Sequence, residues 1–115
     1  MNQKLVAASS VNVLCQLAED NFSKLRGFDY ATICNSLTKL KPRSEASDIL
    51  AIEMIRRLVP KWIKLPTTDR GKDAQGCVNV FHAIGTFNIR DESMWRPVLE
   101  ALLLLKRYLT PQYMP

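Results

Sequence analysis

The chain has 115 residues, 47% of them hydrophobic, and carries a net charge of +5 with a pI near 9.3. This length supports one domain with a modest core, and the composition excludes a wholly disordered chain. The three cysteines are an odd number without a C-x-x-C spacing, which argues against a disulfide scaffold and favours a reducing compartment. No apolar run approaches the roughly 18 residues of a membrane span, so we expect no membrane-spanning helix.

Residues 4–26 carry the first apolar pattern, and we assign them to a leading helix. Its apolar residues recur in an i, i+4, i+8 progression: Leu5, Val6, Val13, Leu14, Leu17 and Ala18. Gly27 is the expected C-terminal stop, because glycine tolerates the left-handed conformation that ends many helices.

A first helix–loop–helix unit is predicted over residues 28–66. Asp29 is the expected N-cap of its first helix, because a carboxylate accepts hydrogen bonds from the free amides of a first turn. This helix reaches about Leu40, since the following Pro42 cannot continue it.

The second helix of this unit opens at Ser44 or Ser47 and runs toward Ile63. Pro60 lies within its apolar pattern, so we expect a kink there or an end one turn early. Residues 64–72, KLPTTDRGK, form the clearest loop of the chain.

A second helix–loop–helix unit is predicted over residues 72–111. Asp73 is the expected N-cap of its first helix, which ends near Phe87. The last helix runs to about Leu109, before a short tail.

The two units repeat one pattern at an offset of 44 residues. With Asp29 placed on Asp73, an acidic residue is followed by asparagine at +6 and by apolar residues at +4, +5, +8 and +11: Ile33 on Cys77, Cys34 on Val78, Asn35 on Asn79, Leu37 on Phe81 and Leu40 on Ile84. Apolar residues at this spacing share one face of a helix. A period in this range indicates a helical array. We therefore predict an all-α fold, a helical-repeat solenoid segment of about five helices in a single domain over residues 1–115.

The repeated segment resembles a known family of helical repeats. The pattern D-x-x-x-φ-φ-N-x-φ-x-x-φ, with RDESMWRPVLEALL after a short turn, is similar to the FAST-kinase-like and octotricopeptide repeats that accompany RAP domains in organellar RNA-metabolism proteins. Residues 73–103 match best and residues 29–58 next. Where the family has a Trp-Ala pair and then Lys-Leu-Gly, this chain has FHAIG at 81–85 and LTKL at 37–40. The resemblance implies a place in a mitochondrial matrix ribonucleoprotein, in a ribosomal or RNA-processing assembly.

Basic residues suggest how such a protein contacts RNA. A positive balance favours acidic partners, and a basic stripe can track a phosphate backbone. The densest cluster is Arg56, Arg57, Lys61 and Lys64, with Lys39, Lys41 and Arg43 next, and we predict phosphate contacts at these seven residues. A charge run is equally typical of a solvated face without a partner.

Asn35 and Asn79 recur at one register, which leaves two interpretations. They can contact bases, as repeat proteins do with a few side chains in each repeat. They can also hydrogen-bond neighbouring helices within the array, because buried polar groups need partners, and this structural interpretation is the favoured one.

The last helix is apolar on more than one side. Leu102 to Leu105 are four consecutive leucines, and a helix of this kind is buried on several faces. Terminal helices of a free solenoid need polar outer faces. We therefore predict an obligate protein partner at Trp95, Leu99, Leu102, Leu103 and Leu104.

Motifs for catalysis are absent from the sequence. It contains no Gly-rich phosphate loop, no paired-carboxylate constellation and no Ser/His/Asp set. His82, the only histidine, follows Cys77 by five residues, which is a poor spacing on a helix for a metal or a catalytic pair. We predict no enzyme activity, no metal, no cofactor and no small-molecule substrate.

These observations lead to two hypotheses about function. The first is a non-catalytic scaffold subunit of a mitochondrial ribonucleoprotein, either the mitoribosome or an RNA-processing or editing complex, that contacts RNA through a basic face and proteins through its last helix. The alternative is a purely protein–protein scaffold, armadillo-like or HEAT-like, in a non-RNA complex such as a respiratory assembly.

Overall fold

The structure, a computed structural model, describes residues 2–105 and is all-α over that range, without a strand. Six α-helices and two 3-10 turns follow one another along the chain: α1 Asn2–Val6, α2 Val11–Asp20, η1 Phe22–Lys24, α3 Gly27–Lys39, α4 Glu45–Ile63, η2 Arg70–Lys72, α5 Ala74–Thr86 and α6 Glu92–Leu105. The predicted all-α class is confirmed, with six α-helices in this range where about five were expected. Residues 106–111 of the second unit lie outside the described residues.

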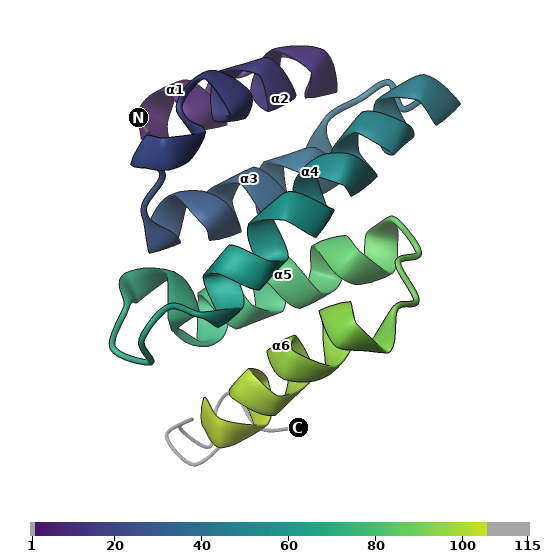
Figure 1. Ribbon diagram of the computed structural model, residues 1–115. Helices are drawn as coiled ribbons and strands as arrows, with labels where there is room; N and C mark the ends of the chain where they lie inside the picture. Colours follow the sequence, from purple (N-terminus) through teal and green to yellow (C-terminus); the bar gives the residue numbers. More distant parts are fainter. Residues whose placement is uncertain (1, 106–115) are drawn as a thin grey trace.

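Alternate helices pack side by side, which arranges them in two layers (Figure 1). One layer consists of α1, α3 and α5, and the other of α2, α4 and α6. α3 and α5 run in the same direction, and α4 and α6 run back against them. The extensive contact between α3 and α5 brings together the two helices that carry the repeated sequence pattern.

The core lies between the two layers and draws on every α-helix. Its fully buried side chains include Leu5, Leu14, Ile33, Leu37, Ile55, Leu58, Val80 and Val98. Trp62, the largest of the buried side chains, donates an indole hydrogen bond to the backbone oxygen of Gly71, 2.7 Å away. This bond fixes the loop between α4 and α5 against the core, because a buried indole N–H needs an acceptor.

The predicted leading helix over residues 4–26 is in fact two helices, α1 and α2, followed by the turn η1. Ser10 caps α2, since its side-chain oxygen accepts a hydrogen bond from the Val13 amide at 3.2 Å. Serine competes with the helix by bonding nearby backbone groups, and so it favours caps over helix interiors. The apolar pattern continues across this break, which is why periodicity alone did not find it.

The start of α3 also differs from the prediction. Gly27 is the first residue of the helix and not the stop of the preceding one, and Asp29 is its third residue. The Asp29 carboxylate reaches back to accept a hydrogen bond from the Arg26 amide at 2.9 Å, and the residue is only 6% exposed. A Cβ at position 27 would collide with the Asp69 carboxylate, so a larger residue there would displace that side chain.

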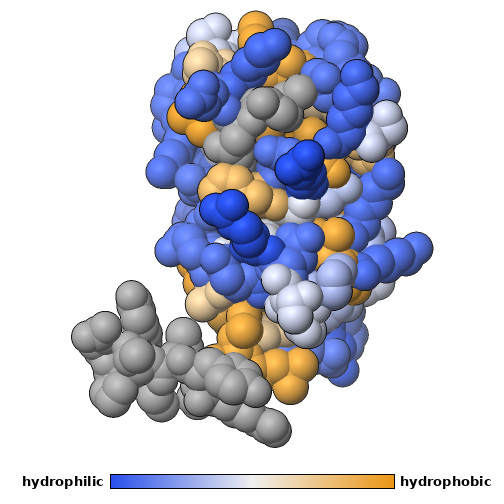
Figure 2. Space-filling view, turned by 90° about the vertical axis from the view of Figure 1, so that its left-hand side faces the viewer, coloured by the Kyte–Doolittle hydropathy of each residue, from blue (hydrophilic) through white to orange (hydrophobic). Residues whose placement is uncertain are grey.

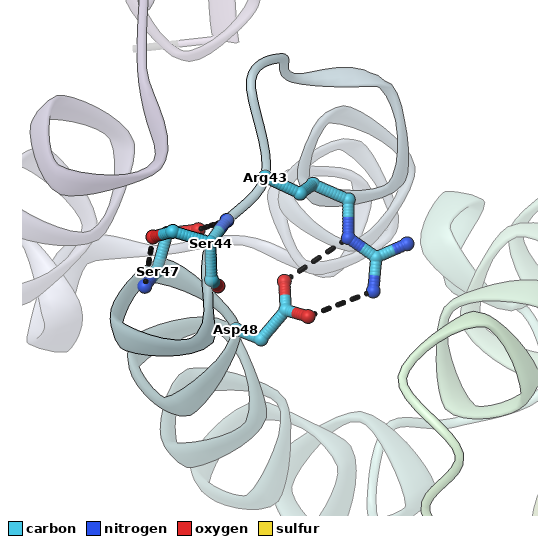
Figure 3. A network of polar contacts seen from close by, with 4 residues as sticks. All are labelled: Arg43, Ser44, Ser47 and Asp48. Atoms are coloured by element: carbon cyan, nitrogen blue, oxygen red, sulfur yellow. Dashed lines mark hydrogen bonds and ion pairs between the residues drawn. The ribbon is translucent and has the colours of Figure 1, made fainter.

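Helix α4 begins as predicted, with Ser44 as its N-cap (Figure 3). The hydroxyl of Ser47 accepts from the Ser44 amide at 2.9 Å, and Ser44 Oγ accepts from the Ser47 amide at 3.1 Å. Pro60 does not end the helix early, since α4 continues to Ile63. Beyond it, Lys72 Nζ donates to the carbonyl oxygen of Ile63 at 2.8 Å and so satisfies one of the acceptors that a helix end leaves free.

Helix α5 keeps the predicted cap and turns part of the predicted apolar face outward. The Asp73 carboxylate accepts from the Gly76 amide at 2.7 Å. Asn88, with φ of 57°, follows the end of the helix in the left-handed conformation. Val78 is 47% exposed, whereas Cys34, its counterpart in α3, is fully buried. The two repeat units are therefore more alike in sequence pattern than in which of their residues are buried.

Two glycines of α5 provide a matched test of this packing. A Cβ at Gly76 would collide with the backbone oxygen of Gly71, whereas a Cβ at Gly85 meets no atom within 4 Å. We expect Gly76→Ala to lower the free energy of unfolding by about 1–3 kcal/mol through overpacking. Gly85→Ala, the control, should raise it by up to about 1 kcal/mol, because alanine favours helix. Urea unfolding followed by circular dichroism measures both, and equal effects would contradict the close approach.

Candidate functional site

A groove of about 430 Å³ lies on the layer formed by α1, α3 and α5. Its volume falls in the range of ligand sites. Both polar and apolar residues line it: Val6, Ala8, Phe28, Ala31, Thr32, Asn35, Ser36, Lys39, Leu40, Arg70, Asp73, Gln75, Gly76 and Asn79. Most of these residues belong to α3 and α5, the two repeated helices.

The amphipathic pattern of α3 explains how this helix lines the groove. Ile33, Cys34 and Leu37 are fully buried and fix one face of the helix in the core. Residues spaced by three or four positions share a helix face. Phe28, Thr32, Asn35, Ser36 and Lys39 follow that spacing and form the groove face of α3.

The structure brings the two repeated asparagines, Asn35 and Asn79, into this one groove. Both side chains are half-buried. Asn79 Oδ1 accepts a hydrogen bond from Gln75 Nε2 at 2.9 Å, which leaves its NH₂ group as a donor. The Asn35 side chain makes no hydrogen bond to any residue between 2 and 105. Its amide thus offers both a donor and an acceptor to a ligand.

Two cationic residues and one acidic residue complete the groove. Lys39 is exposed at the end of α3, and Arg70 extends from η2 with its guanidinium 5.4 Å from the centre of the Phe28 ring. The Asp73 carboxylate is already engaged as the N-cap of α5. The groove therefore combines amides, hydroxyls, cations and an exposed aromatic ring.

The predicted phosphate contacts on α4 are mostly held in ion pairs. Arg56 bonds both oxygens of Asp91, at 2.7 and 3.1 Å, and Arg57 pairs with Glu19. The hydrogen bonds from Arg56 lower the pKa of the Asp91 carboxyl, and Asp91 in turn raises the pKa of the guanidinium. These pairs tie α4 to α2 and to the residue preceding α6.

The other predicted basic residues are spread over several parts of the fold. Arg43 forms a two-point ion pair with Asp48, at 3.0 Å for each bond (Figure 3). Its guanidinium lies 4.8 Å from the centre of the Phe87 ring. Lys61 Nζ and the Arg57 guanidinium both lie over the ring of Phe22, at 4.4 and 4.2 Å. Lys41 and Lys64 are exposed. The seven residues therefore do not share one element: only Lys39 lines the groove.

Phe28 is the groove residue that the sequence interpretation missed. It is 46% exposed, although it is aromatic. The signal that could have found it is its position five residues before Ile33, which puts an aromatic ring on the polar face of an amphipathic helix.

The predicted protein interface on α6 is exposed in part. Leu103 and Leu104 are 55% and 57% exposed, and Leu99 is half-buried. Trp95 and Leu102 pack against the core, and the Trp95 indole donates to the carbonyl oxygen of Arg90 at 3.2 Å. Figure 2 shows apolar surface gathered at the lower end of the molecule, beneath a mostly hydrophilic face.

Reactive side chains are not assembled into a site in the described part of the chain. No group of three or more histidine, cysteine or acidic residues able to hold a metal ion occurs there. His82 is exposed, with Thr86 Oγ1 3.4 Å from its Nε2. Burial raises the pKa of the Cys34 thiol to about 12, and that of the Cys15 and Cys77 thiols to about 11.

Comparison with protein-family models, with curated proteins and with solved structures finds no match to this chain. None of the described helices is both long enough and apolar enough to cross a membrane. The described residues thus present two candidate features: the groove, and the ion pairs of Arg56 and Arg57 on α4.

The cysteines provide a direct test of burial. Because a raised pKa leaves less thiolate at a given pH, we expect Cys15, Cys34 and Cys77 to react slowly with a disulfide reagent at pH 8. In denaturant all three should react at the rate of a free thiol. Absorbance of the released thiol measures both rates, and fast labelling of the native protein would contradict the packing.

Proposed function

We propose that this protein is a non-catalytic helical-repeat scaffold that binds single-stranded RNA in a mitochondrial ribonucleoprotein. The observation that carries the proposal is the meeting of Asn35 and Asn79 in one groove with Lys39 and Arg70. Sequence-specific RNA recognition uses unpaired bases, whose edges hydrogen-bond to side chains such as amides. Cations in the same groove supply the attraction to phosphate.

The arrangement of the helices supports a solenoid. Each helix of the described units packs on the helix two positions along the chain, α1 on α3, α3 on α5, α2 on α4 and α4 on α6. Stacked repeats of a solenoid contact their neighbours in this way and expose an extended binding surface. The mitochondrial compartment and the ribosomal or RNA-processing setting rest on the resemblance to organellar repeats.

Recognition would proceed by two kinds of contact. Lys39 and Arg70 neutralise backbone phosphates, which gives affinity that falls with salt. The amides of Asn35 and Asn79 bond base edges, which gives preference among sequences. Arg56 and Arg57 contribute only if phosphate displaces their carboxylate partners, and exposed ion pairs are weak enough for that exchange.

The asparagines are tested by alanine substitution. We expect Asn35→Ala with Asn79→Ala to weaken binding of a single-stranded RNA by about 5- to 150-fold, the range of about 1–3 kcal/mol for a lost base contact. Fluorescence anisotropy with a labelled RNA pool and its selected sequences measures the change. Asn12→Ala, at an exposed asparagine of α2, is the matched control and should change nothing.

The cation of the groove is tested by salt dependence. Lys39→Gln should weaken binding to all sequences alike and reduce the slope of log affinity against log salt by about 1. Arg96→Gln, at an exposed arginine of α6 that pairs with Glu92, should leave the slope unchanged. Equal slopes for wild type and Lys39→Gln would contradict a phosphate contact at this residue.

An exposed leucine on α6 supports the proposed contact with a partner protein. The second helices of the two units match at an offset of 46 residues, two more than the first helices, and this places Leu104 on Leu58, whose side chain is fully buried. Leu104 has no such cover and is 57% exposed. The repeat therefore predicts the occupant of this surface: a helix of a partner protein, packed as the helices of this chain pack on α4.

Loss of this contact is measurable in a mitochondrial extract. Leu103→Gln with Leu104→Gln should abolish copurification of the partners that survive ribonuclease treatment, while RNA binding by the groove stays intact. Val78→Gln, at an exposed apolar residue of α5, is the control. If both variants retain the same partners, the leucines are not the interface.

A second candidate function, a protein scaffold without RNA, is favoured by the ion pairs of Arg43, Arg56 and Arg57. Paired arginines of this kind tie helices together and need no phosphate. Arg56→Gln with Arg57→Gln discriminates between the roles of α4. If the double variant binds RNA as tightly as the wild type, Arg56 and Arg57 have only a structural role. If the wild-type protein itself binds no RNA, the second candidate function is favoured.

A further inference from the structure

We propose that Phe28 and Arg70 form a stacking site for one unpaired nucleobase at the η2 end of the groove. This inference rests on the proposed function and adds to it a second nucleotide, recognised by the face of its base. Aromatic rings and guanidinium planes are the surfaces on which unpaired bases stack.

Phe28 is more exposed than the other aromatic residues that meet an arginine from a distant part of the chain. It is 46% exposed, whereas Phe22, beside Arg57, is half-buried and Phe87, beside Arg43, is 5% exposed. Phe28 lies on the groove face of α3, opposite the core face, so it cannot be buried in the core. An exposed ring flanked by polar residues is therefore presented to a ligand.

Arg70 is the groove arginine without an ion pair. Arg43, Arg56, Arg57 and Arg96 form ion pairs, whereas Arg26, Arg70 and Arg90 form none with any residue from 2 to 105, and of these three only Arg70 lines the groove. Its guanidinium lies 5.4 Å from the centre of the Phe28 ring. The guanidinium therefore covers one face of the ring and forms the outer plane of a ring–guanidinium stack, on which a base can pack with the charge beside its own phosphate.

Close backbone contact holds η2, which carries Arg70, against the first turn of α3, which carries Phe28. The Gly71 position is so close to α3 that a Cβ there would meet the Phe28 amide nitrogen at 2.7 Å and collide with Gly27. Gly71 is fixed in turn by Trp62, whose indole bonds its oxygen, and by Asp69, whose carboxylate accepts from its amide at 2.8 Å. A surface that is rigid before binding loses little entropy on binding.

The stacking site and the asparagines serve different nucleotides. Asn35 lies seven residues after Phe28 on α3, which is about 10 Å along the helix axis. Stacked bases follow one another at about 3.4 Å, so this rise spans about three bases, and we assign the ring and Asn35 to different bases of one strand. The ligand is therefore a strand with at least two unpaired bases, and a duplex, whose bases already stack on each other, does not fit.

The test combines variants of Phe28 with an abasic strand. Phe28→Ala should weaken binding of single-stranded RNA by about 5- to 150-fold, Phe28→Leu should weaken it as well, and Phe28→Tyr should restore it. On an RNA of the same length without bases, wild type and Phe28→Ala should bind equally, because nothing is left to stack. Circular dichroism confirms that each variant folds.

The outcomes separate this inference from the proposed function. If the wild-type protein binds single-stranded RNA and Phe28→Ala binds it equally well, stacking is overturned and RNA binding stands. If Phe28→Ala loses as much affinity for the abasic strand as for RNA, or if Phe28→Leu binds like wild type, the ring acts only as apolar surface and stacking is again overturned. If the wild-type protein binds no RNA, both proposals fall.

Discussion

The close approach of Gly27, Gly71 and Gly76 is the constraint on which the rest of the structure depends. No Cβ fits at any of the three positions, because backbone atoms or the Asp69 side chain occupy the space. The loop between α4 and α5 can therefore enter between the first turns of α3 and α5. Trp62 and Lys72 then fasten that loop to the end of α4.

This constraint positions the groove. Because the first turns of α3 and α5 are held against one loop, the two helices run in the same direction at nearly one register (Figure 1). The side chains that recur along the sequence then meet in space, and Asn35 and Asn79 line one surface. The arginines of α4 serve a different purpose, since Arg56 and Arg57 link that helix to its neighbours.

The sequence predicts those features that arise from local chemistry. Helical periodicity identifies α3, α4 and α5, and the caps at Ser44 and Asp73 follow from side chains that bond their own first turns. The break at Ser10 and the start of α3 at Gly27 were missed, because tertiary contacts decide between equally helical alternatives. The groove was found only in part: the asparagines recur in sequence, but the pairing of Phe28 with Arg70 joins residues 42 positions apart.

The parallel course of α3 and α5 has an electrostatic consequence. Peptide dipoles align along a helix and leave about half a positive charge at its N-terminus and half a negative charge at its C-terminus. Both N-termini meet at Gly71, where the carboxylates of Asp29 and Asp73 offset the positive ends of α3 and α5. Lys39 offsets the negative end of α3. The last turn of α5 carries no basic residue, so its negative end stays uncompensated, and the two ends of the groove would not be equivalent for a polyanion.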